Sequence, residues 1–316
     1  MECKQKFVIV SPRQSSGGGI VLHILCEELI KKGYDAKIFF TQAYPRPKEA
    51  KFHFWLRWFK HFVIDTVKLA LAAVLPKRIL EKGAAFNGYH YKVCKNYRRK
   101  YLPWVDDKTI VIYPDVVYGN FLKAKKVVRW FLHYNRYDDS AYEPTDHFFA
   151  YKELFNDQHL NPENKILKLT FYDSDTFCQK NFDKRKGRCY IIRKGSKRSD
   201  IPTHFKGPII DDYSEEEKAR AFNQYKYCVF YDLETGYTWL AAVCGCIPVL
   251  MIPEDSSKDE FVKTKRIVKG VACGVSKTEI RSAVENRNNI FVMTEENKNK
   301  NKKSMEYFID YCKKNF

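Results

Sequence analysis

The chain has 316 residues, 45% of them hydrophobic and 16% aromatic, which suffices for two domains with substantial cores and excludes a disordered chain. Its formal net charge of +18 indicates a negatively charged partner. Nucleic acid, an anionic membrane surface and a phosphate-bearing ligand all satisfy that requirement.

The cysteines and the longest apolar run exclude other classes of protein. Ten cysteines occur at scattered spacing, with neither a CxxC pair nor a Cys/His cluster suited to zinc, so reduced thiols and no metal site are expected. The apolar run at 62–75 has fourteen residues and contains Asp65 and Lys68, whereas a bilayer span needs ~20. Since charged residues lead directly into FVIV at the start, no secretion signal is predicted, and a cytoplasmic protein is expected.

The first half of the chain predicts a βαβ opening. Lys6–Val10 is a short apolar run typical of a buried parallel strand. A polar glycine loop at 11–19 and a helical pattern ending at Gly33 follow, and Ala36–Phe40 forms the second strand. Further strands are predicted at Thr109–Tyr113 and Lys126–Leu132.

A basic, aromatic insert lies between these strands, at 48–104. It carries thirteen Lys and Arg against three acids, which is more than half of the chain's excess charge. One helical face is predicted to hold Trp55, Trp58, Phe59, Phe62, Thr66, Leu69 and Ala73. Such a helix is either half-buried core or an interfacial helix on an anionic membrane, and periodicity does not separate the two.

The α/β pattern restarts near residue 160. Strands are predicted at Lys165–Phe171, Cys189–Arg193, Tyr227–Tyr231 and Ile247–Ile252, and helices at 214–226, 277–286 and 303–313. Ser214 and Glu217 have the spacing of a capping box, which marks the start of one helix. We therefore predict an α/β protein with two Rossmann-like domains, 1–160 and 161–300, facing each other across a cleft, and a final helix at 301–316.

Three stretches carry candidate site residues. The glycines of SSGGG (15–19) allow a ligand to approach the backbone at a helix N-terminus, although the motif is neither GxGxxG nor a P-loop and also fits a plain turn. In IIRKG (191–195), Arg193 and Lys194 follow a buried strand, where two cations would neutralise a diphosphate; a solvated basic loop is the alternative. His133 follows another strand and is either a structural residue or a site residue.

Aromatic residues in DHFFAYKELF (146–155) are predicted to pack in the core.

The stretch YDLETGYTWLAAVCGCIPV (231–249) differs from the other candidate stretches. It places carboxylates and hydroxyls after a strand, ahead of a helix of small residues and a Gly-Cys-Ile-Pro-Val turn into the next strand.

In the order of these features, and in residue detail at 227–251, the chain resembles GT-B glycosyltransferases similar to bacterial family 4. The resemblance implies that Gly17, Gly18 and Gly19 approach the donor phosphates and that Arg193 and Lys194 bind the diphosphate. It also implies donor contacts from Asp232, Glu234, Thr235 and Tyr237, and a role for His133 beside the donor sugar. A second glutamate is common in that family; Ala241 and Ala242 stand there in this chain.

The resemblance further implies a hexosyltransferase that needs neither metal nor cofactor and retains anomeric configuration. Its donor would be a nucleotide-diphosphate sugar. Its acceptor would be a saccharide or a lipid-linked saccharide, in synthesis of a surface polysaccharide such as lipopolysaccharide or capsule. The insert at 48–104 would then contact the inner face of an anionic membrane, and no nucleic acid would be bound.

Two rival classes are weighed against this one. A basic nucleic-acid-binding protein would explain the charge and the aromatics, but no helix-turn-helix, RNA-recognition or zinc-finger pattern is present. A nucleotide-dependent epimerase is disfavoured because GxGxxG and a Tyr-x-x-x-Lys pair are both lacking.

Overall fold

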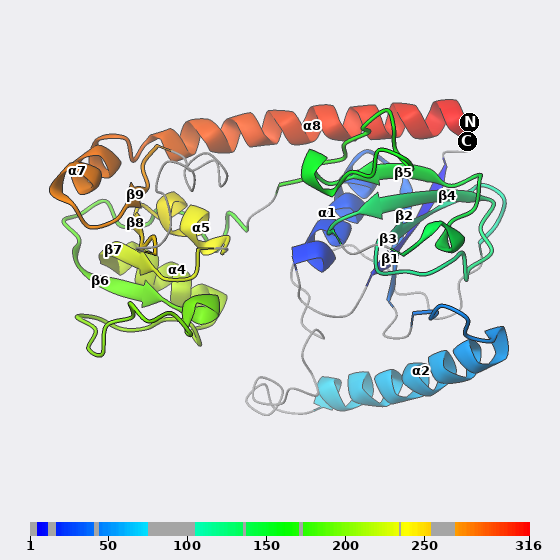
Figure 1. Ribbon diagram of the computed structural model, residues 1–316, viewed down its shortest axis with the longest axis horizontal. Coiled ribbons are helices and arrows are strands. Elements are labelled where there is room, and N and C mark those ends of the chain that lie inside the picture. The colour runs from blue at the N-terminus through cyan, green and yellow to red at the C-terminus, as the bar shows by residue number, and fades with distance from the viewer. Residues whose placement is uncertain are drawn as a thin grey trace. The chain divides into compact units, whose positions relative to one another are not determined.

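The computed structural model describes residues 5–11, 17–40, 44–74, 105–134, 137–170, 173–233, 235–253 and 269–316. The chain forms two compact units, the first Met1–Phe171 with Lys300–Phe316 and the second Tyr172–Asn299. Each unit contains one parallel sheet flanked by helices, which confirms the predicted α/β class with two Rossmann-like domains (Figure 1). The division between the units falls after Phe171 and again after Asn299.

The first unit has a five-stranded sheet in the order β2-β1-β3-β4-β5, with every pair parallel. Its elements are β1 (Lys6–Ser11), α1 (Gly17–Lys31), β2 (Asp35–Phe40), α2 (Lys51–Val74), β3 (Thr109–Pro114), β4 (Lys126–Phe131), the 3-10 turn η2 (Asp139–Ala141), β5 (His147–Ala150) and the 3-10 turn η3 (Glu153–Phe155). From β1 the chain continues to β2 on one side of β1, and it then returns to β3 on the other side. The strand order therefore reverses between β1 and β3. In doubly wound sheets, ligands bind outside the carboxyl ends of the strands at such a reversal.

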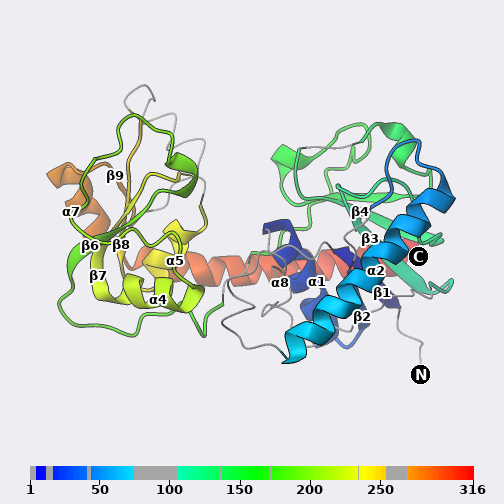
Figure 2. The same cartoon turned by 90° about the horizontal axis from the view of Figure 1, so that it is seen from below.

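Helices cover both faces of this sheet. On one face, α1 and the last part of α8 (Asn289–Asn315) pack on the strands through Leu25, Leu29, Phe308 and their neighbours. On the other face, α2 packs through Phe54 and Trp58. Figure 2, seen from below, shows α2 lying across the strands. The predicted C-terminal helix therefore packs on the first unit, although α8 begins well before residue 301.

The strand predicted at Lys165–Phe171 is wrong over the residues described, 165–170. One bridge joins Ala150 to Ile166, and the ladder then stops. The reason is a tertiary contact: the amides of Lys168 and Thr170 donate to the side chains of Ser304 and Asn301 in α8. The edge of the sheet is instead formed by β5, from the stretch that the sequence assigned to core packing; Phe149 is fully buried, so the packing itself is confirmed.

The predicted apolar face of α2 is corrected in part. Trp58 is buried and Phe62 half-buried, as expected, and they share their stripe with Phe54. Trp55 and Phe59 are 38% and 58% exposed, since a single stripe of the helix is enough to cover the sheet. The helix is thus apolar on two sides, and one of them faces away from the core.

The second unit has a four-stranded parallel sheet in the order β6-β7-β8-β9. Its elements are β6 (Lys186–Ile191), the 3-10 turn η4 (Arg193–Gly195), α4 (Glu215–Gln224), β7 (Tyr225–Phe230), α5 (Tyr237–Val243), β8 (Ile247–Leu250), β9 (Ala272–Cys273), α7 (Lys277–Glu285) and the start of α8. The capping box is confirmed: the Glu217 amide donates to Ser214 Oγ at 3.2 Å, and the Ser214 amide to Glu217 Oε2 at 2.8 Å.

Candidate functional site

The carboxyl edge of the second sheet begins with a turn held by a carboxylate. Asp211 accepts the amide hydrogens of Ile192 at 3.0 Å and of Arg193 at 2.9 Å, directly after β6 ends. Arg193 has φ = 31°, in the left-handed region of backbone conformation that residues other than glycine rarely adopt. Arg193 therefore lies in a turn and not in a strand as predicted. Strain of this kind persists where the surroundings hold the backbone in place.

Gly195 lets this turn approach the end of β7. A Cβ at residue 195 would lie 2.3 Å from the Tyr231 carbonyl oxygen and 3.2 Å from the Asp232 amide nitrogen. No side chain fits into that space. The glycine thereby brings the exposed cations Arg193 and Lys194 beside the segment that carries Asp232, although the two stretches lie almost forty residues apart in sequence.

Tyr237 connects these cations to a third one. The Arg193 guanidinium lies 5.6 Å from the Tyr237 ring centre, and the Lys218 ammonium lies 5.1 Å from it. The Tyr237 hydroxyl donates to Glu215. Lys218 is buried and donates to the Tyr213 carbonyl; burial is the main cause that lowers the pKa of its ammonium. Two positive groups therefore face one aromatic ring.

Sequence reasoning missed Lys218, because a lysine on an amphipathic helix is normally solvated. It also missed Arg198, whose guanidinium donates to the carbonyls of Tyr231 at 3.3 Å and Met251 at 2.7 Å. Arg198 forms two further bonds to Asp200, and the side-chain hydrogen bond lowers the pKa of that carboxyl. Arg198 thus ties the ends of β7 and β8 together and is already neutralised.

The remaining predicted donor contacts lie between β7 and α5. Asp232 is buried where β7 ends, and Thr235 Oγ1 accepts the Tyr237 amide hydrogen at 3.2 Å at the start of the helix. That bond leaves the hydroxyl proton of Thr235 available for a phosphate. Glu234 lies outside the described residues.

One of the two alanines that stand where the resemblance predicts a glutamate lies in the core. Ala241 is fully buried and packs in the core with Phe222 and Phe230. A carboxylate at 241 would therefore be buried in that core. Cys244 and Cys246 are buried in the same cluster, among the free cysteines of the described residues.

The first unit has its own polar edge. Gly17, Gly18 and Gly19 form the first turn of α1 instead of a loop, and a Cβ at Gly18 would lie 3.5 Å from Leu132. The N-terminus of α1 therefore approaches the end of β4. His133 follows β4, is exposed, and has its ring 5.9 Å from that of Phe155. Asp115, which sequence reasoning missed, is buried directly after β3.

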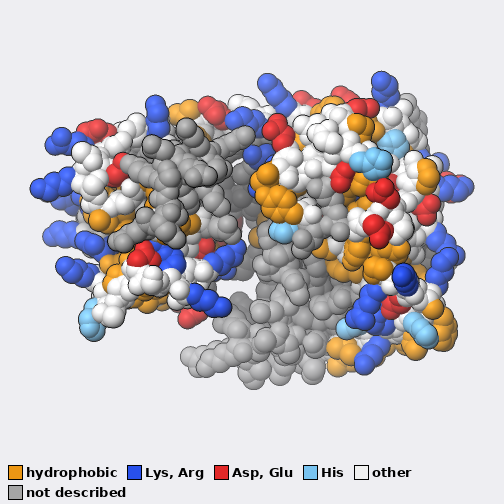
Figure 3. Space-filling view, in the orientation of Figure 1, with side chains coloured by type: hydrophobic (Ala, Val, Ile, Leu, Met, Phe, Trp, Pro, Cys, Tyr) orange, Lys and Arg blue, Asp and Glu red, His pale blue; other side chains and the backbone are white. Residues whose placement is uncertain are grey.

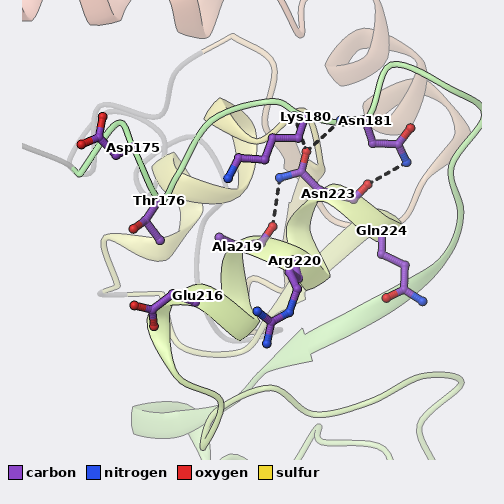
Figure 4. A pocket seen from close by; sticks show the side chains of 9 residues that line it. All are labelled: Asp175, Thr176, Lys180, Asn181, Glu216, Ala219, Arg220, Asn223 and Gln224. Carbon is purple, nitrogen blue, oxygen red and sulfur yellow. Dashed lines mark hydrogen bonds between the residues drawn. The ribbon is translucent and has the colours of Figure 1, made fainter.

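One cavity in the second unit does not include these groups. It has a volume of about 670 Å³ and runs along α4, where Figure 4 shows Lys180, Asn181, Arg220 and Asn223 among its lining. Asn223 accepts the amide hydrogens of Lys180 and Asn181 and donates to the carbonyls of Cys178 and Ala219. The side-chain oxygen and nitrogen of Asn223 therefore anchor the chain at this cavity. No group of three or more His, Cys, Asp or Glu that could hold a metal ion occurs in the described part of the chain.

No family model matches the chain and no curated protein matches it. Among solved structures, it is similar to the glycotransferase of kitacinnamycin (10% identity, 99% of each chain, TM-score 0.46) and to MurG of Acinetobacter baumannii (10% identity, 98% of this chain and 99% of that one, TM-score 0.37). An α-glucosyltransferase in complex with UDP matches at 12% identity over 96% and 95% of the two chains, with a TM-score of 0.30. All three TM-scores are below 0.5, and the fold assignment rests on the two parallel sheets themselves.

Proposed function

We propose that the protein is a glycosyltransferase that moves a sugar from a nucleotide-diphosphate donor to a saccharide or lipid-linked saccharide. The observation that carries the proposal is the cation group at the carboxyl edge of the second sheet. There, Arg193 and Lys194 are exposed beside Asp232 and Tyr237. Carboxyl edges of parallel sheets are where open α/β proteins bind ligands, and fixed cations stabilise the charge that develops on a departing diphosphate.

In this proposal each side chain has a distinct task. Arg193 and Lys194 bind the diphosphate, the former with a planar fork and the latter with a point charge. Thr235 donates to a phosphate oxygen, and Asp232 and Glu234 accept hydroxyls of the nucleotide sugar. Tyr237, held between two cations, provides a surface for the donor. In the first unit, the amides at Gly17–Gly19 favour a phosphate and His133 contacts the donor sugar.

Donor binding is the direct test. We expect UDP, GDP, ADP or dTDP, alone or as sugar conjugates, to raise the melting temperature of the full chain. CMP, a monophosphate, would have a smaller effect because it lacks the second phosphate that the cations bind. Lys194→Ala should remove the shift and abolish donor hydrolysis while its own melting temperature stays unchanged, since Lys194 is exposed. Unchanged turnover in that variant would contradict its role. Salt-sensitive binding of unspecific DNA without any nucleotide effect would favour the nucleic-acid-binding alternative.

We further propose that α2 holds the enzyme against an anionic bilayer, where lipid-linked saccharides of a surface polysaccharide are found. Large apolar side chains are exposed along one side of the helix at helical spacing. They are Phe52, Leu56, Phe59, Val63 and Val67. Figure 3 shows hydrophobic side chains interspersed with Lys and Arg over α2. Within the described residues no helix is long and apolar enough to cross a membrane. An amphipathic helix rich in basic and aromatic residues is typical of interfacial binding.

Co-sedimentation with vesicles checks this proposal. The wild-type chain should sediment with vesicles rich in phosphatidylglycerol and stay in solution with pure phosphatidylcholine. Phe59→Asp should weaken binding about tenfold or more, since burying an apolar side chain of this size contributes about 1.5–3 kcal/mol. Leu154→Asp, at another exposed apolar residue of the first unit, is the matched control and should bind as the wild type does. Equal sedimentation with both lipids, or no effect of Phe59→Asp, would rule out α2 as the contact.

A further inference from the structure

A second cavity lies wholly within the first unit, at the amino ends of its strands. Asp146 directly precedes β5 and His147 is the first residue of that strand, and both line the cavity. The remaining wall comes from η2, from His159 and Lys165, and from Tyr311 of α8. Its volume is about 380 Å³, within the range of about 300–1,000 Å³ that small-ligand sites occupy. None of the residues proposed above for donor binding belongs to it.

The positive groups of this lining are already paired with carboxylates. His159 Nε2 lies 3.3 Å from Asp139 Oδ2, and the Lys165 ammonium lies 3.4 Å from Glu163 Oε2. Glu143, which is exposed, adds a further carboxylate to the wall. The lining therefore offers no unpaired cation among the described residues, and a phosphate or a carboxylate ligand would be repelled. A neutral ligand is favoured.

Hydrogen-bonding groups and aromatic rings share the wall. His147 Nδ1 and the Tyr311 hydroxyl oxygen lie 2.7 Å apart, so each presents a polar group next to the cavity. The rings of Tyr142 and Phe148, two other lining residues, meet edge to face with their centres 5.4 Å apart. A sugar ring has hydroxyl groups around its edge and C–H bonds on its faces. Aromatic rings beside a few fixed polar groups match both of these features.

Asp146 provides a separate observation that points to a ligand. Its Oδ2 accepts from Arg129 Nε at 2.7 Å and from the Glu143 amide at 3.2 Å. Its Oδ1 is buried and has no hydrogen-bond partner among the described residues. Buried carboxylate oxygens without a donor are rare. Because Arg129 already balances the charge, Oδ1 needs a neutral donor and not a second cation, and a ligand hydroxyl in the cavity beside Asp146 is such a donor.

We propose that this cavity is an accessory saccharide site, which holds a neutral sugar ring that is not being transferred. Asp146, His147, His159 and Tyr311 bind its hydroxyls, and the neighbouring aromatic rings pack on its C–H faces. The binding follows from the cavity alone. Its purpose rests on the proposed glycosyl transfer: a site of this kind retains part of a saccharide acceptor or product on the enzyme while the donor is exchanged.

NMR of the full chain tests the site directly. Saturation-transfer difference spectra are recorded with the methyl glycosides of glucose, galactose, mannose, N-acetylglucosamine and rhamnose. We expect at least one of them to bind, and excess UDP should leave its signal unchanged because the cavity has no unpaired cation for a diphosphate. Titration with that glycoside should shift the ring-proton signals of His147 and His159, assigned from their His→Ala variants. The signals of His204, an exposed histidine of the second unit, should stay in place.

Two variants test the lining. Tyr311→Phe removes the hydroxyl and keeps the ring, and His159→Ala removes a side chain that is 78% exposed, so its melting temperature should match that of the wild type. Each should weaken glycoside binding by about three- to tenfold, the usual contribution of one hydrogen bond. His204→Ala is the matched control and should bind as the wild type does.

The outcomes separate this site from the proposed function. Absence of binding by every glycoside overturns the accessory site. Binding that UDP displaces, or that neither variant weakens, places the sugar elsewhere and also overturns it, while glycosyl transfer stands. Glycoside binding at His147 and His159 in a chain that neither binds nor hydrolyses nucleotide sugars supports the site and overturns the proposed function.

Discussion

Arg193→Gly is expected to lower the rate of the proposed sugar transfer by about 10²–10³-fold and to stabilise the second unit relative to Arg193→Ala. Arg193 has φ = 31°, and Asp211 holds this backbone through two amide hydrogen bonds. A left-handed conformation costs about 1–2 kcal/mol for a residue with a Cβ, and glycine avoids that cost. Glycine loses about 0.5–1 kcal/mol more in conformational entropy on folding, so the net gain is small and positive.

The loss of activity follows from the side chain alone. The Arg193 guanidinium is exposed at the edge of the sheet beside Tyr237, where the proposal places the diphosphate. Removing one fixed donor that stabilises transition-state charge lowers kcat by about 10²–10³-fold. Arg193→Ala should lose the same activity but keep the strain, so the usual order of stability, alanine above glycine, is reversed at this position.

Steady-state kinetics and thermal denaturation of the two variants make the comparison. Lys226→Ala is the matched control: it removes an exposed cation at the amino end of β7, on the opposite edge of the same sheet, and should change neither quantity. A glycine variant that transfers sugar normally would contradict the diphosphate role. If Arg193→Gly is less stable than Arg193→Ala, the backbone at Arg193 is not strained.

The fold was largely predictable because its determinants are local. Buried parallel strands read as continuous apolar runs, and four of the five strands of the first sheet were placed within a residue or two of their observed ends. The Ser214 capping box marked its helix for the same reason. The predictions failed where tertiary contacts determine the backbone conformation. The amide of Lys168, for example, bonds to α8, more than a hundred residues away in sequence.

The candidate site was predictable only where one stretch carries several of its residues. Arg193 and Lys194 follow a strand, and the position after a strand has a meaning in any parallel sheet. Lys218 had no such mark, whereas Asp115 follows a predicted strand and was overlooked. The significance of Lys218 comes from burial and from the Tyr237 ring, and each of these depends on the packed structure.

Breaking the buried ion pair of the first unit should have the largest effect on stability. Arg129 lies within β4, is 1% exposed, and donates from Nε to Asp146 Oδ2 at 2.7 Å. The guanidinium also donates to the carbonyls of Val117 at 3.3 Å and Gly119 at 3.1 Å, and it lies 4.7 Å from the Tyr113 ring centre. The sequence indicated only a buried strand here, so the charge in its middle was unexpected.

Arg129→Met should destabilise the first unit by about 3–5 kcal/mol, because it leaves the buried Asp146 carboxylate without its charge partner. At about 2–4 °C per kcal/mol for a unit of this size, the melting temperature should fall by roughly 10 °C. Lys125→Met is the control. Its ion pair with Asp107 is also 2.7 Å long, but both side chains are 71% exposed, and removing such a pair changes stability by about 0–1 kcal/mol.

The double variant Arg129→Met with Asp146→Leu distinguishes the value of the pair from the penalty of breaking it. Replacing both charges of a buried pair by apolar groups of similar volume is often neutral, since the desolvation of two ions offsets their attraction. We therefore expect the double variant to recover most of the stability that Arg129→Met loses. If it remains as unstable as the single variant, the hydrogen bonds to Val117 and Gly119 contribute more than the ion pair does, and Arg129 acts mainly as a donor to the loop that follows Asp115.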